Sequence, residues 1–229
     1  MSHRTPTTLF FAGTDTDVGK TYTSALVAQW LVRKGKRVGV YKPVASGCRE
    51  VDGRRIAEDA VALWEAAGCP RTLDEVCPQR FLAPLAPPTA AAEENATVDI
   101  SLLRKGADCW GTDFDVLIVE GAGGLMSPLA DGLLNIDLAK QFECELVIVA
   151  ANRLGVIHQT LATCAAAEYG SLKPSGIFLC QVNEEPDGSA KTNAEQIAKY
   201  TDIPILGSVS YQGQADQVVG IDDLLAKKG

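Results

Sequence analysis

The sequence predicts a doubly wound α/β domain built on a single, mostly parallel sheet. Strand-like apolar runs alternate with helix-like segments along the chain, several of these runs are continuous, and a glycine-rich loop follows the first. Continuous apolar runs are typical of strands that are buried on both faces of a parallel sheet. Because 229 residues can share one core, we predict one domain spanning residues 1–229.

Each element follows from its local pattern. The predicted strands lie at residues 8–12, 37–41, 115–119, 146–151, 175–182 and 204–209. Helical patterns occupy residues 20–34, 56–67, 136–142, 157–169 and 193–200. Residues 69–95 hold five prolines, so we expect this region to be irregular and to lie over an edge or face of the sheet.

Composition limits which partners the protein can bind and which cellular compartment it can occupy. The net charge of −8 opposes binding to nucleic acid. Seven cysteines, an odd number without a C-x-x-C pair, predict neither a disulfide framework nor a zinc site. We find no apolar run of the roughly 18–20 residues that a membrane span needs, and no apolar leader core. We therefore expect a cytoplasmic protein without membrane or nucleic-acid partners.

The loop GTDTDVGKT at residues 13–21 joins the first strand to the first helix, which is the context that a nucleotide phosphate loop requires. Backbone N–H groups and the helix N-terminus can surround a polyphosphate. Lys20 adds a positive charge near the β- and γ-phosphates, and the Thr21 hydroxyl can hold Mg²⁺. Five residues, one more than usual, separate Gly13 from the final Gly-Lys-Thr. The sequence thus predicts ATP as co-substrate with a P-loop NTPase-like fold.

Charged residues at other strand ends can complete such a site. Glu120 ends an apolar strand and opens a glycine-rich turn, so its carboxylate is expected in the ligand crevice. Lys42 follows the second strand, at the same edge of the sheet. Asp59 lies in the first turn of a helix, and Glu58 beside it is a rival for any metal role.

Together these residues resemble the dethiobiotin synthetases. The matching motifs are GTDTDVGKT at 13–21, YKPVASG at 41–47, EDAVAL at 58–63, VEGAGG at 119–124 and LGVI at 154–157. The longer phosphate loop is also typical of that family. The resemblance implies a ligase of biotin biosynthesis that binds 7,8-diaminopelargonate, CO2 and ATP. In its reaction a carbamate forms on one amine, is phosphorylated by ATP, and is then attacked by the second amine to close the ureido ring.

The same resemblance implies roles for individual residues. Lys20 and Lys42 are the implied catalytic residues, and the implied Mg²⁺ ligands are Thr21, Asp59 and Glu120. The implied nucleotide-binding residues are Asp17, Val18, Gly19, Lys20, Thr21, Tyr22, Asp59, Glu120, Gly121, Ala122, Gly123 and Asn183, of which Asn183 reads the adenine edge. The implied substrate-binding residues are Thr16, Ser46, Gly123, Gly124, Leu154, Gly155 and His158.

The resemblance also implies a homodimer, in which His158 either reaches the substrate from the second subunit or only caps a helix. The family often has a proline in the segment after the last strand, and this chain lacks it. We therefore assign Ser210, Tyr211 and Gln212 no role in base recognition.

Two other functions use a similar loop. A nucleotide-gated switch ATPase of the partitioning type usually carries a lysine near the start of the loop, where this chain has the acidic stretch GTDTD. The ATP-binding half of a cobyrinate-type amidotransferase needs an appended glutaminase domain, for which 229 residues leave no room. Dependence of ATP turnover on the diamine distinguishes a synthetase from a switch ATPase.

Overall fold

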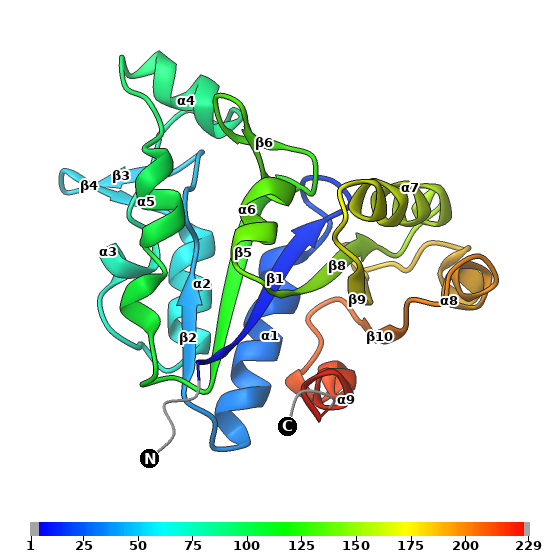
Figure 1. Ribbon diagram of the computed structural model, residues 1–229. Helices are drawn as coiled ribbons and strands as arrows, with labels where there is room; N and C mark the ends of the chain where they lie inside the picture. The colour runs from blue at the N-terminus through cyan, green and yellow to red at the C-terminus, as the bar shows by residue number, and fades with distance from the viewer. Residues whose placement is uncertain (1–4, 227–229) are drawn as a thin grey trace.

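The computed structural model describes residues 5–226, which form a six-stranded sheet flanked by helices (Figure 1). All neighbouring strands in this sheet run parallel. The strand order is β10 (Ile205–Val209), β9 (Pro174–Cys180), β8 (Glu145–Ala151), β1 (Thr7–Gly13), β5 (Val116–Gly124) and β2 (Val38–Tyr41). The predicted fold class and all six predicted strands are confirmed.

Helices cover both faces of the sheet, as Figure 1 shows. Five helices match the predicted ones with shifts at their ends: α1 (Lys20–Arg33), α2 (Glu58–Ala66), α6 (Asn135–Gln141), α7 (Val156–Tyr169) and α8 (Ala190–Ala198). Other helical elements are α5 (Ile100–Lys105), η1 (Asp108–Trp110), η2 (Ala215–Val218) and α9 (Gly220–Ala226). Helix α1 packs against α2 and η2, while α7 packs against α8 and α6 against α5. Because the strands are buried between these layers, the core follows the sheet.

The region at residues 69–95 contains two short helices, so the prediction that it is irregular is wrong for them. Helix α3 (Leu73–Val76) begins with a capping box between Thr72 and Glu75. Helix α4 (Pro87–Glu93) opens with two prolines. Proline lacks an N–H group, but the first turn of a helix leaves that group unpaired in any case, so proline is compatible with this position.

Two small antiparallel hairpins were also not predicted. The first pairs β3 (Arg49–Val51) with β4 (Arg54–Ile56) through an Asp-Gly turn in which both residues have positive φ, as a tight hairpin requires. The second pairs β6 (Pro128–Ala130) with β7 (Leu133–Leu134) after β5. Helix α4 packs against β6, which brings two long connections together near one end of the sheet (Figure 1).

The strand order locates the ligand crevice. Strand β1 lies between β5 and β8, and the chain places β2 and β5 on one side of β1 before it adds β8, β9 and β10 on the other. In open α/β sheets, ligands bind at the carboxyl ends of strands where the order reverses in this way. The phosphate loop, the loop after β2 and the turn after β5 all start at this edge. Within residues 5–226, no helix combines the length and apolar character that a bilayer crossing needs.

Candidate active site

A cavity of about 960 Å³ opens at the carboxyl ends of β1, β2 and β5. Three segments that are far apart in the sequence meet there: the phosphate loop, the loop after β2 and the turn after β5. The predicted site residues that line the cavity are Thr16, Asp17, Gly19, Lys20, Thr21, Tyr22, Lys42, Ser46, Asp59, Ala122 and Gly123. Most of the residues that the motifs singled out therefore lie together at the carboxyl ends of these strands.

The phosphate loop ends at a position that only glycine can occupy. Gly19 has φ of 84°, in the left-handed region, and directly precedes α1. A Cβ atom at this position would lie 2.3 Å from Sγ of Cys180 at the end of β9. The loop backbone thus packs directly on β9, and the first N–H groups of α1 remain available to an anion in the cavity.

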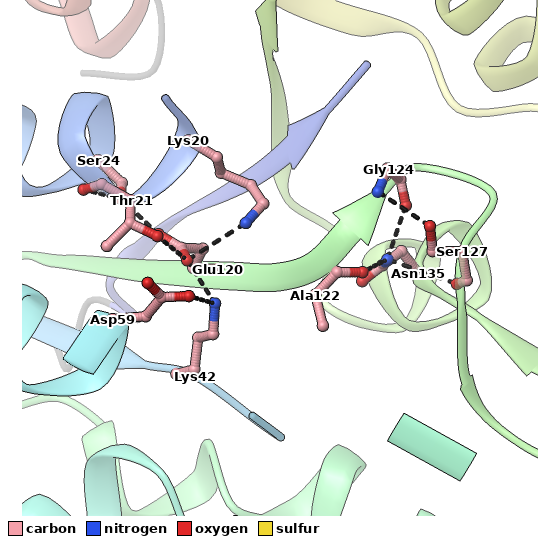
Figure 2. Close-up of polar contacts among 10 residues, drawn as sticks. All are labelled: Lys20, Thr21, Ser24, Lys42, Asp59, Glu120, Ala122, Gly124, Ser127 and Asn135. Atoms are coloured by element: carbon pink, nitrogen blue, oxygen red, sulfur yellow. Dashed lines mark hydrogen bonds and ion pairs between the residues drawn. The ribbon is translucent and has the colours of Figure 1, made fainter. Parts of the chain in front are cut away.

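One buried carboxylate connects the charged residues of the site (Figure 2). Oε1 of Glu120 lies 2.6 Å from Nζ of Lys42 and 3.3 Å from Nζ of Lys20. The hydroxyl of Thr21 donates a hydrogen bond of 2.8 Å to the same oxygen. The hydroxyl of Ser24 donates one of 2.7 Å to Oε2. Glu120 is fully buried and Lys42 is 2% exposed, so water does not screen these contacts.

The charges of this cluster shift the ionisation of its members. Burial favours a raised pKa for Glu120, but attraction to Lys20 and Lys42 outweighs burial and lowers the pKa to about 2. Burial alone would lower the pKa of Lys42, whereas Glu120 and Asp59 raise it above its usual value. Burial lowers the pKa of Lys20, and the neighbouring Lys42 ammonium adds to this effect while Glu120 opposes it. Glu120 and Lys42 therefore stay charged at neutral pH.

The structure separates the two candidate carboxylates at the start of α2. Oδ2 of Asp59 accepts a hydrogen bond of 2.8 Å from Nζ of Lys42, and Asp59 lines the cavity. Glu58 instead pairs with Arg49 on the hairpin, 2.5 Å away, and both side chains are largely exposed. Asp59, and not Glu58, therefore belongs to the charged cluster.

Comparison with known proteins identifies the family. A family model described as "AAA domain" matches residues 7–218. The chain is 47% identical over 211 residues to the ATP-dependent dethiobiotin synthetase BioD of Rhodopirellula baltica, covering 87% of this chain and 82% of that protein. The chain belongs to the dethiobiotin synthetase family. It is also 35% identical to the enzyme of the same name from Bacillus subtilis strain 168, over 86% of this chain and 84% of that protein.

Membership of the dethiobiotin synthetase family confirms the resemblance and the predicted class, an ATP-dependent ligase. Both of these relatives are named dethiobiotin synthetases, so they do not favour a partitioning ATPase. Among solved structures, the signal recognition particle receptor FtsY from Elizabethkingia anophelis aligns with a TM-score of 0.54 at 15% identity. The alignment covers 96% of this chain but only 65% of the receptor chain, so it supports the fold alone.

Some residues expected in a dethiobiotin synthetase site do not line the cavity. Glu120 does not line the cavity but contacts Lys20 and Lys42, which do, and Val18 is buried. Gly121 and Gly124 flank Ala122 and Gly123 on β5 without lining the cavity themselves. Leu154, Gly155 and His158 are exposed at the start of α7, outside the cavity. Asn183 is exposed and follows Gln181 and Val182, which do line it.

The cavity also contains residues to which no role was assigned. They are Asp15, Ala45, Gly47, Pro84, Leu85, Ala86, Pro87, Ser127, Pro128, Cys180, Gln181, Val182, Tyr211 and Gln212. Tyr211 and Gln212 lie in the segment after β10, which the hydroxyl of Tyr22 reaches through a hydrogen bond of 2.6 Å to the Gly213 carbonyl. Ser24 was missed because a helical serine one turn after the phosphate loop carries no signal of its own. Its spacing of three residues from Thr21 was the only available hint.

Proposed function

We propose that this protein closes the ureido ring of dethiobiotin from 7,8-diaminopelargonate, CO2 and ATP. One observation carries the proposal: Lys20 and Lys42, which line the cavity, both contact the carboxylate of Glu120. One ammonium group belongs to the phosphate loop and the other lies beside it. Together they are suited to a reaction in which one anion attacks another. The family membership supports the same reaction.

The proposed reaction has three steps. An amine of the substrate adds to CO2, loses a proton and becomes a carbamate. A carbamate oxygen then attacks the γ-phosphorus of ATP, so a new O–P bond forms while the bond to the β-phosphate oxygen breaks and ADP leaves. Finally the second amine attacks the carbamate carbon, the C–O bond breaks, phosphate leaves and the ring is closed.

Lys20 and Lys42 can offset the charge repulsion that opposes the second step. A carbamate and a γ-phosphate repel each other, and phosphoryl transfer depends mainly on positioning and on neutralising charge. We assign Lys20 to the ATP phosphates and Lys42 to the oxygens of the carbamate and the γ-phosphate. Glu120 holds Lys42 in place, and its depressed pKa keeps it an acceptor at neutral pH.

The donor set suits magnesium. Thr21, Asp59 and Glu120 offer only oxygen atoms, which Mg²⁺ prefers, and Asp59 is half exposed toward the cavity. Within residues 5–226 no group of three or more His, Cys, Asp or Glu side chains gathers, and water and phosphate oxygens would complete the coordination. Mg²⁺ bound there would add positive charge to the phosphates.

We further propose that the protein is a cytoplasmic homodimer. All seven cysteines are free, which fits a reducing compartment. Leu154 is 81% exposed, and His158 lies near it outside the cavity of its own protomer, so a second protomer is the means by which they reach substrate. We keep Thr16, Ser46, Gly123 and Gly124 as the substrate contacts of the first protomer.

Mixing inactive Lys42→Ala and His158→Ala proteins tests the shared site. Activity should return, because a mixed dimer has one intact site. No recovery would argue against shared sites.

The deciding experiment is ATP turnover with and without the diamine. We expect ADP and dethiobiotin to form in equal amounts, with strict dependence on both diaminopelargonate and bicarbonate. A switch ATPase would hydrolyse ATP at the same rate without the diamine, and that result would overturn the proposal.

A further inference from the structure

Asn135 is the first residue of α6 and is fully buried beside the turn that follows Glu120. Its Nδ2 donates hydrogen bonds to the carbonyl oxygens of Ala122 at 2.6 Å and Gly124 at 2.7 Å. A third contact, to the carbonyl of Ser127, is longer at 3.4 Å. Figure 2 shows this amide facing Ala122 and Gly124 at the end of β5. Since two carbonyl acceptors surround the nitrogen, the amide group can take only this orientation.

These bonds determine the direction of a neighbouring N–H group. In a planar trans peptide the N–H points opposite to the C=O. The Ala122 carbonyl points to Asn135, so the Gly123 N–H of the same peptide points away from Asn135. Ala122 and Gly123 line the cavity, whereas Asn135 does not. The next peptide is also held, because the Gly124 N–H donates a 3.0 Å bond to the hydroxyl of Ser127.

The other end of the Asn135 amide shows that this arrangement has a cost. Oδ1 is buried and has no hydrogen-bond partner among the described residues. A buried acceptor without a partner loses its hydrogen bond to water and gains none in return. Oδ1 faces Gly121, where a Cβ atom would lie only 2.2 Å from it. Gly121 therefore makes room for Asn135, and the sequence keeps an imperfectly satisfied amide at the centre of the turn.

We infer that Asn135 is a positioning residue that holds the Ala122–Gly123 peptide so that the Gly123 N–H meets an anionic oxygen of the reactants. The inference rests on the proposed function. The oxygen belongs to the γ-phosphate or to the substrate carbamate or carboxylate, and a preset backbone donor stabilises charge without reorganising during the reaction. Asn135 itself touches neither reactant.

The test compares Asn135→Ala with Asn193→Ala. Asn193 is 3% exposed, and its Nδ2 also makes side-chain hydrogen bonds, to Asn152 at 2.9 Å and Ser189 at 3.1 Å, but it does not line the cavity. Both variants lose a buried amide, so both should melt at a lower temperature. Only Asn135→Ala should lower kcat, by about tenfold or more, which is less than the roughly 10²–10³-fold loss on removing an oxyanion donor because the Gly123 N–H is displaced and not removed.

The Michaelis constants assign the oxygen. A rise in KM for the diamine alone indicates a substrate oxygen. A fall in kcat with unchanged KM for ATP and for the diamine indicates an oxygen that the Gly123 N–H contacts only in the transition state. A rise in KM for ATP alone indicates the γ-phosphate. If Asn135→Ala keeps the kcat and KM values of Asn193→Ala, the inference is wrong.

A second measurement does not depend on the folding of a variant. In ¹⁵N-labelled wild-type protein, the Gly123 amide resonance should shift on addition of a non-hydrolysable ATP analogue together with the diamine. An unmoved Gly123 resonance, while resonances of the phosphate loop shift, would overturn the inference. Wild-type protein that binds the ATP analogue but makes no dethiobiotin would instead count against the proposed function.

Discussion

Lys42 and Glu120 form a buried ion pair of 2.6 Å between neighbouring strands of the sheet. Lys42 follows β2 directly, and Glu120 lies within β5, so the strand register itself places the ammonium beside the carboxylate. If either side chain moved away, the other would lose its shortest charge contact at a position where both are almost fully buried. The pair is therefore both part of the core and part of the site.

The first prediction concerns the two lysines. We expect Lys42→Ala and Lys20→Ala each to lower turnover by about two orders of magnitude or more, the effect of losing a major charge contact in the transition state. Steady-state kinetics with the diamine and bicarbonate measures this. Lys199→Ala is the control, since Lys199 forms only an exposed pair with Glu195. Near-wild-type turnover in both site variants would refute the assignment.

The second prediction concerns the stability contributed by Glu120. Its folded-state pKa is depressed to about 2, so its contribution is complete above the ordinary pKa of 4.5 and is lost as the pH falls toward 2. We expect Glu120→Gln to lower the free energy of unfolding at pH 7 by about 3–5 kcal/mol, because two buried ammonium groups lose the carboxylate between them and only Lys42 keeps another, Asp59. The deficit relative to wild type should shrink as the pH falls toward 3.

Urea unfolding at several pH values measures both quantities. Glu58→Gln is the matched control, since Glu58 forms an exposed pair with Arg49 and should change stability by no more than about 1 kcal/mol. A constant difference between Glu120→Gln and wild type from pH 7 to pH 3 would show that the Glu120 carboxylate is not held by the lysines.

The third prediction separates backbone strain from steric contact in the phosphate loop. Gly19 and Gly35 both have positive φ, at 84° and 76°. A Cβ at Gly19 meets Cys180, whereas a Cβ at Gly35 meets nothing within 4 Å. Gly35→Ala should therefore cost only about 1–2 kcal/mol of stability, with ATP-analogue binding intact. Gly19→Ala should cost more and weaken binding, as calorimetry can show. Equal effects of the two substitutions would mean that the loop does not need its close contact with β9.

The fourth prediction concerns the choice of nucleotide. We expect Asn183→Ala to retain turnover but to relax the preference for ATP over CTP, because Asn183 follows the cavity residues Gln181 and Val182. Glu184→Ala, at the adjacent exposed position, should leave the preference unchanged. The ratio of kcat/KM for the two nucleotides measures the effect. If that ratio is the same in Asn183→Ala as in wild type, another residue reads the base.

Much of the fold could be predicted because the sheet is buried. Strands such as β8 are apolar from their second residue onward, and this pattern has few alternatives. Helix α4 was missed because Pro87 and Pro88 read as a break in the pattern, although they occupy the first turn of a helix. The β3–β4 hairpin has only three residues on each side and exposed charged side chains, so it has no hydrophobic periodicity to detect.

The site was predictable where residues adjoin strand ends. Lys20, Lys42 and Glu120 could be placed together because the carboxyl ends of parallel strands share one edge. Asn135 could not, because its contact with Ala122 spans thirteen residues and depends on how a turn folds back over the end of β5. The location of Leu154 and His158 outside the cavity also had no signal in a single chain, since a surface residue and an interface residue look the same in sequence.

The position of Glu120 in a strand flanked by both β1 and β2 constrains how this molecule can change. The charged end of the crevice is held in place by the sheet. The opposite walls of the cavity come from the connections after β2, β9 and β10. Evolution toward a different amine or a different base must therefore alter those connections. The phosphoryl-transfer chemistry itself is inherited with the scaffold.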